Sequence, residues 1–348
     1  MSVTVRAVDL DTEHEELLAV LERNLTDLPH ARRFKWIYRD NPLGPAWSWF
    51  ACAGATGRVV GVASVFRRAM WLGRRMMVCG QVGDFAIDAG HRSLGPAVML
   101  QRATFEPVDR GSLTLCYDCP PHDRGMSTFR RIGMEASASL ARHAKLLRAN
   151  RKIEGRIGEG PVARALAPVG NALIWLRDGD VPRPNGLEIA RHPGRFGGEF
   201  TELDERVRSR DVIRGRRSAE DLNWRYRDNP LHEFGTLAAR RRGELIGFVI
   251  LSGAGRDATL VDLFGDFHPG DALGLLDAAA DEARVAGAET LHATVSDDSH
   301  LVVDLGRAGF SRREAGPHVV AYTAPGSEDR AQLDRPLTWD LTHQDIMA

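Results

Sequence analysis

The hexapeptide YRDNPL stands at Tyr38–Leu43 and again, unchanged, at Tyr226–Leu231 of this 348-residue chain. Proline pushes the residue before it out of the helical conformation, so Asn-Pro is a pair that stops helices and starts turns. We therefore expect each copy to end a helix. The repeat itself leaves two interpretations, a duplicated active-site element or the remnant of a duplicated fold.

The similarity extends on both sides of the hexapeptide. Two residues before the tyrosine, Trp36 corresponds to Trp224, and we expect each Trp-x-Tyr pair to pack its helix on a sheet. Downstream, both halves show the same succession of patterns, which is a glycine turn, a β-rich strand, a buried-strand pattern and an apolar-periodic helix. The matched segments are Gly57–Phe66 with Gly243–Ser252 and Val82–Ile87 with Val261–Gly265, and each half closes with a helix that ends at a glycine, Gly133 or Gly309.

These matches divide the chain into an N-terminal domain at residues 1–148, a connecting segment at 149–198 and a C-terminal domain at 199–348. The connecting segment is rich in Gly, Pro and Arg, but one apolar stretch predicts a helix over Val162–Leu176. The apolar positions of the tail RPLTWDLTHQDIMA predict a strand or a packed end. The duplication thus favours two α/β domains in tandem.

The composition excludes several classes of protein. No apolar run approaches the roughly 20 residues of a membrane span, and the N-terminus lacks the pattern of a secretory signal, so we expect a cytoplasmic protein without membrane contact. A net charge of −1 supplies no general attraction for nucleic acid. Cys116 and Cys119 form a single C-x-x-C pair, too few ligands for a zinc site, so we predict no metal.

The stretch IDAGHRSLGPAVMLQRA, Ile87–Ala103, carries the most chemical information. A hydrophobic strand runs into a turn with Arg92, Gly95 and Ala97 and then into an apolar-periodic helix. Small residues at a helix N-terminus leave backbone N–H groups free to bind a pyrophosphate. Pro96 costs little in the first turn, because its missing N–H would have no helical partner.

This order of elements resembles the acyl-CoA core of the GNAT N-acyltransferase superfamily, whose Q/R-x-x-G-x-G/A signature matches Arg92, Gly95 and Ala97. The resemblance implies two tandem GNAT-like domains, each a mixed, mostly antiparallel sheet flanked by helices. It also implies acetyl-CoA or another acyl-CoA as co-substrate. The residues implied at the CoA site are Arg92, Ser93, Leu94, Gly95, Pro96 and Ala97 at the pyrophosphate, with Phe85, Ala86 and Ile87 offering backbone N–H groups to the thioester carbonyl.

The second half departs from this signature. At the corresponding place it reads GDFHPGDALGLL, without the arginine, and Asp266 and Asp271 add negative charge that opposes a phosphate. We therefore predict that only the first half binds the cofactor.

Acyl transfer to an amine also needs groups that move protons. The resemblance suggests Asp84, before the phosphate turn, as the base, whereas Asp88 and His91 could orient the turn or cap the helix. The family's tyrosine acid corresponds here to Phe129, which has no proton to give. Substitutes for the acid are Tyr117, His122 and Asp123, and the candidates on the acceptor side are Arg39, Asp40 and His122.

Three functions remain open from the sequence. The first is an acyl-CoA-dependent N-acyltransferase acting on a small amine, amino sugar or amino acid derivative. The second is an aminoacyl-tRNA-dependent transferase, since the tandem architecture also resembles Fem-type aminoacyltransferases and the basic run Arg142–Arg156 could follow tRNA phosphates. A solvated helical face is the simpler interpretation of that run, as surface charge is for Arg216 and Arg217, which precede a predicted N-cap at Ser218. The third is a binding protein without catalysis. The oligomeric state is not predicted.

Overall fold

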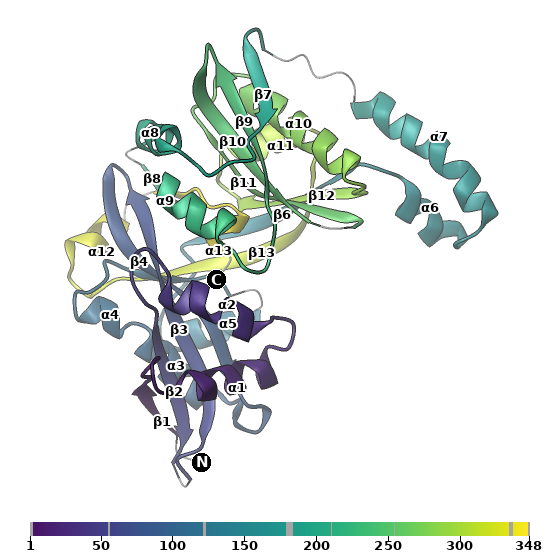
Figure 1. The fold of residues 1–348 in the computed structure, drawn as a ribbon. Helices are drawn as coiled ribbons and strands as arrows, with labels where there is room; N and C mark the ends of the chain where they lie inside the picture. Colours follow the sequence, from purple (N-terminus) through teal and green to yellow (C-terminus); the bar gives the residue numbers. More distant parts are fainter. Residues whose placement is uncertain are drawn as a thin grey trace.

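One sheet of fourteen strands runs through both halves of the protein in the computed structural model (Figure 1). Its main path follows the order β1-β2-β3-β4-β5-β13-β6-β12-β11-β10-β9-β7, and β8 and β14 join beside it. The structure describes residues 3–54, 56–120, 123–178, 184–209, 211–253, 255–333 and 337–346. The predicted mixed, mostly antiparallel sheet with flanking helices is confirmed.

The first half builds the sheet from β1 to β5, because its β-branched and aromatic runs form long strands with buried faces. Its elements are β1 (Val3–Ala7), α1 (His14–Asn24), α2 (His30–Phe34), the π-helical turn η1 (Lys35–Arg39), β2 (Trp47–Ala53), β3 (Val59–Leu72), β4 (Arg75–Ile87), the 3₁₀ turn η2 (Ala89–His91), α3 (Leu94–Ala103), α4 (Glu106–Asp109), β5 (Cys116–Asp118), α5 (Asp123–Arg131) and β6 (Ala138–Leu146).

The second half repeats the main order, with β8 inserted before its π-helical turn and with α12, β14 and α13 added at its end. Its elements are β7 (Leu187–Arg191), α8 (Gly198–Arg206), β8 (Val212–Gly215), α9 (Ala219–Leu222), the π-helical turn η3 (Asn223–Arg227), β9 (Gly235–Arg241), β10 (Glu244–Ser252), β11 (Asp257–Gly265), α10 (Asp271–Val285), β12 (Thr290–Ser296), α11 (Leu301–Arg307), β13 (Ser311–Tyr322), α12 (Glu328–Leu333), β14 (Thr338–Trp339) and α13 (His343–Ile346).

The halves exchange their last strands. Strand β6 of the first half pairs antiparallel with β12 of the second, from Leu146 opposite Thr290 to Leu140 opposite Ser296. In return, β13 of the second half pairs with β5 of the first, where Val320 lies opposite Asp118. The predicted domain boundaries stay a prediction, but each half's sheet is completed by a strand of the other.

The π-helical turns that lead into the two hexapeptides meet where the halves face each other. Each hexapeptide lies at the end of a π-helical turn, and the Trp36 and Trp224 rings stack with centroids 5.0 Å apart. The indole Nε1 of Trp36 donates to the Trp224 carbonyl at 2.8 Å, and the Trp224 indole donates to the Trp36 carbonyl at 3.3 Å. The prediction that Asn-Pro ends a helix is confirmed in both copies. The tryptophans, however, join the two halves rather than only packing a helix on its own sheet.

Residues 150–178 of the connecting segment project from the body of the protein as two helices, whereas its strand β7 pairs with β9 (Figure 1). The two helices are α6 (Asn150–Ile157) and α7 (Pro161–Asp178), and α7 confirms the predicted helix. In the part of the chain that the structure describes, no helix is long and apolar enough to cross a membrane.

Two predictions about charged residues need correction. Arg217 was expected at the surface but is 1% exposed, because it forms ion pairs with Asp262 at 2.9 Å and Asp345 at 3.2 Å. The prediction of a packed C-terminal end explains this: β14 pairs with β8, which places the Asp345 carboxylate, also bound by Arg68 at 3.2 Å, between the halves. Ser218 is the N-cap of α9, as predicted, and accepts from the Asp221 backbone N–H.

The basic run Arg142–Arg156 is not one helical face. Its first part lies on β6, where side chains alternate between the two faces of the sheet, and its second part on α6. Arg142 pairs with Glu314 at 2.8 Å, Arg151 pairs with Asp257 at 2.9 Å, and Arg148 donates to the Arg284 carbonyl at 2.8 Å. These contacts hold the run to the second half instead of leaving it as a free row of cations.

Candidate functional site

The candidate site is a gap between two parallel strands. β4 and β5 pair only where Gly80 faces Cys116 and Gln81 faces Tyr117, and then they separate. Beyond that point Asp84 has a φ of 48° and the register of β4 on β3 shifts, so the strand bulges away from regular pairing. A cavity of about 730 Å³ opens there, lined by Asn24, Leu25, Phe85, Ala86, Ile87, Arg92, Ser93, Leu94, Ala97, Gln101, Asp118, Pro120, Gly125, Ser127, Thr128 and Phe129.

Most of the residues predicted for CoA line this cavity. The exceptions are Gly95 and Pro96, which lie in the first turn of α3 beside it. A Cβ added at Gly95 would meet no atom within 4 Å, so no side chain occupies the space beside this glycine. The Ser93 side chain makes no capping hydrogen bond, and the first turn has no acidic residue. Because the first amides of a helix have no partner within it, the end of α3 suits an anion.

Side-chain hydrogen bonds of Arg92 and Asp88 hold the turn before α3 in place. The Arg92 Nε donates to the Ile87 carbonyl at 2.8 Å, and its guanidinium reaches Asn24 Oδ1 at 3.2 Å. Asp88 accepts from Arg23 at 2.8 Å and from Asn24 at 2.8 Å, which ties the turn to α1. Burial opposes the charge of Asp88, but these donors outweigh it and keep its pKa low. Asp88 therefore orients the turn, while Ser93 occupies the N-cap position.

The corresponding turn in the second half is filled by the protein itself. Asp271 in the first turn of α10 is fully buried, accepts from the His268 backbone N–H at 3.0 Å and pairs with Arg241 at 2.7 Å. The Phe267 ring lies so close to Gly247 that a Cβ there would collide with it. A carboxylate thus occupies the first turn of α10, whereas the first turn of α3 has no acidic residue.

Asp84 lies in a buried cluster. Its Oδ2 accepts from the Tyr38 hydroxyl at 2.6 Å, and its Oδ1 accepts from the Arg33 guanidinium. Tyr38 is the tyrosine of the first hexapeptide, and it also contacts Ser64 at 3.2 Å. Because both carboxylate oxygens are engaged, these contacts favour a positioning role, in which Asp84 fixes the end of η1 on the β4 bulge. Its role as the base stays a prediction.

Of the other residues considered for proton transfer, some line the cavity and others do not. Phe129 lines the cavity, as its place in the sequence implied. Tyr117 does not, since its hydroxyl donates to the Asp345 carbonyl at 3.0 Å in a buried cluster away from the cavity, and burial raises its pKa far above the usual value. This corrects the expectation that Tyr117 faces the site. His122 lies outside the described residues, and the side chain of Asp123 is not described either.

The sequence interpretation missed Asp118, which lines the cavity at the point where β5 leaves β4. Burial raises the pKa of Asp118 to about 7, although the side chain keeps partial exposure, which we assign to the cavity. It stands next to Tyr117 in the sequence, and the period-2 alternation of a strand turns the two side chains to opposite faces. The alternation of side chains on β5 was the sequence signal that could have identified Asp118 as a residue of the site.

Arg39 and Asp40 do not reach this cavity. Arg39 donates to the Leu10 carbonyl at 2.7 Å and pairs with Asp11 at 3.1 Å, and Asp40 approaches Lys35 at 3.9 Å near the surface. The expectation that they line the acceptor side is therefore not supported by their placement.

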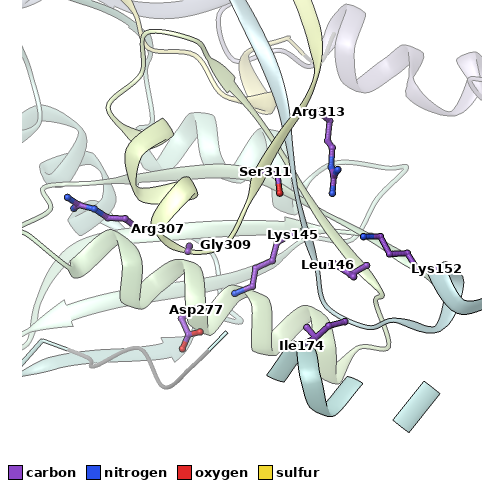
Figure 2. A pocket seen from close by; sticks show the side chains of 10 residues that line it. Lys145, Leu146, Lys152, Ile174, Asp277, Arg307, Gly309, Ser311 and Arg313 are labelled. Carbon is purple, nitrogen blue, oxygen red and sulfur yellow. The ribbon is translucent and has the colours of Figure 1, made fainter. Parts of the chain in front are cut away.

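A second cavity, of about 280 Å³, lies where β6 and the connecting helices α6 and α7 meet the second half (Figure 2). Lys145 extends toward Asp277 in this view, with Lys152, Arg307 and Arg313 around them. The cavity contains no residue of β4, β5 or the phosphate turn, so we place the candidate site in the first cavity. Among the described residues, no group of three or more His, Cys, Asp or Glu could hold a metal ion.

The chain is similar in structure to several solved proteins, whereas its sequence matches no protein-family model and no curated protein. A GCN5-related N-acetyltransferase from Anabaena variabilis shares 12% identity at a TM-score of 0.64, over 92% of this chain and 72% of that one. A tandem GNAT protein from the clavulanic acid biosynthesis pathway shares 16% identity at a TM-score of 0.57, over 94% and 100%. N-myristoyltransferase of Saccharomyces cerevisiae with bound myristoyl-CoA shares 12% identity at a TM-score of 0.57, over 92% and 82%. The predicted GNAT resemblance is confirmed at the level of the fold, and the resemblance to Fem-type proteins stays a prediction.

Proposed function

We propose that this chain, which has the GNAT fold in tandem, is an N-acyltransferase that takes an acyl group, most simply acetyl, from acyl-CoA and transfers it to the amine of a small molecule. The observation that carries the proposal is the open helix end at Gly95, joined to a cavity between separating strands. The first turn of the corresponding helix in the second half holds the buried Asp271 carboxylate, so one cofactor is expected per chain. We expect the protein to work in the cytoplasm.

The residues present fit the parts of acyl-CoA. Leu94 and Gly95 lie in the first turn of α3, where a helix offers its amides no partner, and no carboxylate in that turn would repel a pyrophosphate. The bulge at Asp84 interrupts the regular pairing of β3 with β4, which favours free backbone N–H groups near Phe85 for the thioester carbonyl. Bound there, acyl-CoA would supply the activated acyl group.

In the transfer, a bond forms between the amine nitrogen and the acyl carbon while the carbon–sulfur bond breaks. The amine loses one proton and the sulfur gains one. Phe129 has no proton to donate, so we assign the donation to the Asp118 carboxyl group in the same cavity. Burial raises the pKa of Asp118 to about 7, close to neutral pH, which suits an acid that must donate and recover a proton.

The alternatives have less support. Transfer from aminoacyl-tRNA would use the basic run Arg142–Arg156, but Arg142 and Arg151 are paired with carboxylates of the second half. A protein without catalysis would be favoured by a phosphate turn blocked by side chains, and the first half leaves that turn open.

The test is release of free thiol from acetyl-CoA in the presence of a panel of small amines, with the wild type and with Asp118→Asn. We expect amine-dependent thiol release, lowered roughly 10²- to 10⁴-fold by the substitution. Absence of both thiol release and acetyl-CoA binding in the wild type would contradict the proposal.

A further inference from the structure

The cavity of Figure 2 carries charges that the candidate site does not use. On one side of it Lys145 extends toward Asp277, which is the only acidic residue among the described residues of the lining. The other side is formed by Lys152 of α6 and Arg313 of β13, whose side chains turn toward one another in this view. Two cations thus face the same space, away from the carboxylate.

Lys152 and Arg313 have no carboxylate partner among the described residues. Neither side chain makes a hydrogen bond or an ion pair within that part of the chain. Their neighbours in the sequence differ in this respect, since Arg151 and Arg312 are each paired with an aspartate at 2.9 Å. Because like charges that face one another repel, an anion between Lys152 and Arg313 would replace a repulsion by two attractions.

The wall of the cavity suits a phosphate group. A carboxylate is planar and matches a single guanidinium, whereas a phosphate group presents three acceptor oxygens that separate donors can share. Besides the two cations, the wall offers the Ser311 hydroxyl, two residues before Arg313 on β13. Leu146 and Ile174 add apolar surface beside these donors, and apolar walls strengthen the field of nearby charges.

The surrounding charges favour a small ligand over a nucleic acid. Arg142 and Arg151, in the same basic run as Lys152, are already paired with carboxylates, so the free cations do not continue as a row. Arg307, in the same lining, is paired with Asp304 at 3.8 Å. The cavity volume of about 280 Å³ equals roughly nine waters, which leaves room for a small organic group beside one phosphate.

We propose that this cavity binds the phosphate group of a small phosphorylated molecule through Lys152 and Arg313. The ligand would join the connecting helix α6 to β13 of the second half. It would lie apart from β4, β5 and the turn before α3, none of which contributes a described residue to the lining. The inference is therefore independent of the proposed function.

The test is calorimetric titration of inorganic phosphate into the full chain carrying Gly95→Glu, a substitution that closes the phosphate site expected at α3. We expect one binding site, weakened at least about 10-fold by Arg313→Gln and by Lys152→Gln, because a charge-assisted hydrogen bond contributes roughly one to two powers of ten. Arg74→Gln is the matched control. Arg74 is also exposed and has no partner among the described residues, but it lies in the turn between β3 and β4, so phosphate affinity should stay within about twofold.

Three results would overturn the inference. They are absence of phosphate binding up to about 10 mM, which is above the usual range of KM, unchanged affinity in both Arg313→Gln and Lys152→Gln, and an equal loss in Arg74→Gln. Both cavity side chains are exposed, so we expect the variants to fold like the parent. If the proposed function is wrong, the wild type and Gly95→Glu bind phosphate alike, and the comparison among the variants still decides.

Ribose 5-phosphate, with ribose as its control, identifies the source of the phosphate group. Tighter binding of ribose 5-phosphate than of inorganic phosphate, lost in Arg313→Gln, assigns the cavity to a phosphate ester. Equal binding of the two, also lost in Arg313→Gln, assigns it to the phosphate group alone. Binding of ribose as tight as that of ribose 5-phosphate would overturn the inference, because ribose has no charge for the cations to bind.

Discussion

Replacing Asp118 by asparagine should make the protein more stable at high pH relative to the wild type, and at the same time less active. The pKa of Asp118 is about 7 in the folded protein against an ordinary value of 3.8. A folded-state pKa above the unfolded one means that the protonated carboxyl group stabilises the fold. This contribution is complete below 3.8 and is lost as the pH rises through about 7.

The size of the effect follows from the pKa difference. Each pKa unit corresponds to about 1.4 kcal/mol, so from pH 5 to pH 8 the wild type should lose roughly 2–3 kcal/mol of unfolding free energy through this group. Asparagine does not titrate and avoids the loss. Partial exposure of the side chain screens its charge, which places the expected figure at the lower end of this range.

The assay is urea unfolding of the wild type and Asp118→Asn at pH 5 and pH 8. The other titrating groups contribute equally to both proteins and cancel when the unfolding free energy of the wild type is subtracted from that of the variant. This difference should therefore be about 2 kcal/mol larger at pH 8 than at pH 5, in favour of the variant. Asp27→Asn, in an exposed turn, is the control and should show no such movement. A difference that is the same at both pH values would refute the proposed environment of Asp118.

Two further predictions concern the repeated hexapeptide and the tryptophan two residues before it. Tyr38→Phe removes the donor to Asp84 and should cost about 1–3 kcal/mol of unfolding free energy, whereas Tyr226→Phe removes a hydroxyl without a partner and should change it by less than about 0.5 kcal/mol. Equal effects in urea unfolding would show that the two identical tyrosines have identical roles. In a double-mutant cycle with Trp36→Ala and Trp224→Ala, we expect a coupling of about 0.5–1.5 kcal/mol in the unfolding free energy between the stacked rings. If the two substitutions change the unfolding free energy additively, the stacked rings do not hold the halves together.

The tandem fold could be predicted from the sequence because its evidence is local. The Asn-Pro stops, the glycine turns and the small residues at Gly95 and Ala97 act within a few neighbours, so the repeat and the phosphate turn could be identified from residue order. The exchange of β6 and β13 could not, since pairing between distant strands depends on the assembled sheet. For the same reason Arg217 was expected at the surface. It is buried because its charge is paired with Asp262 and Asp345, which lie 45 and 128 positions away in the sequence.

The candidate site was predicted only in part. Its predicted residues on β4 and α3 line the cavity except for Gly95 and Pro96, which lie beside it, because the signature itself determines their geometry. The side chains expected to act in catalysis were less predictable, since their orientation depends on the strand face. Tyr117 and Asp118 are neighbours on β5, yet the hydroxyl of the first is bound at the C-terminal tail and the second faces the cavity.

The central claim is that the open end of α3 binds the pyrophosphate of acyl-CoA. Calorimetric titration of acetyl-CoA into the wild type, Gly95→Glu and Gly198→Glu tests it directly. Both glycines lie in the first turn of a helix with no atom within 4 Å of an added Cβ, so the two substitutions are matched. We predict one binding site per chain in the wild type and in Gly198→Glu, and loss of affinity by at least about 100-fold in Gly95→Glu, where a carboxylate replaces the anion. Acetyl-CoA affinity that is unchanged by Gly95→Glu would contradict the claim.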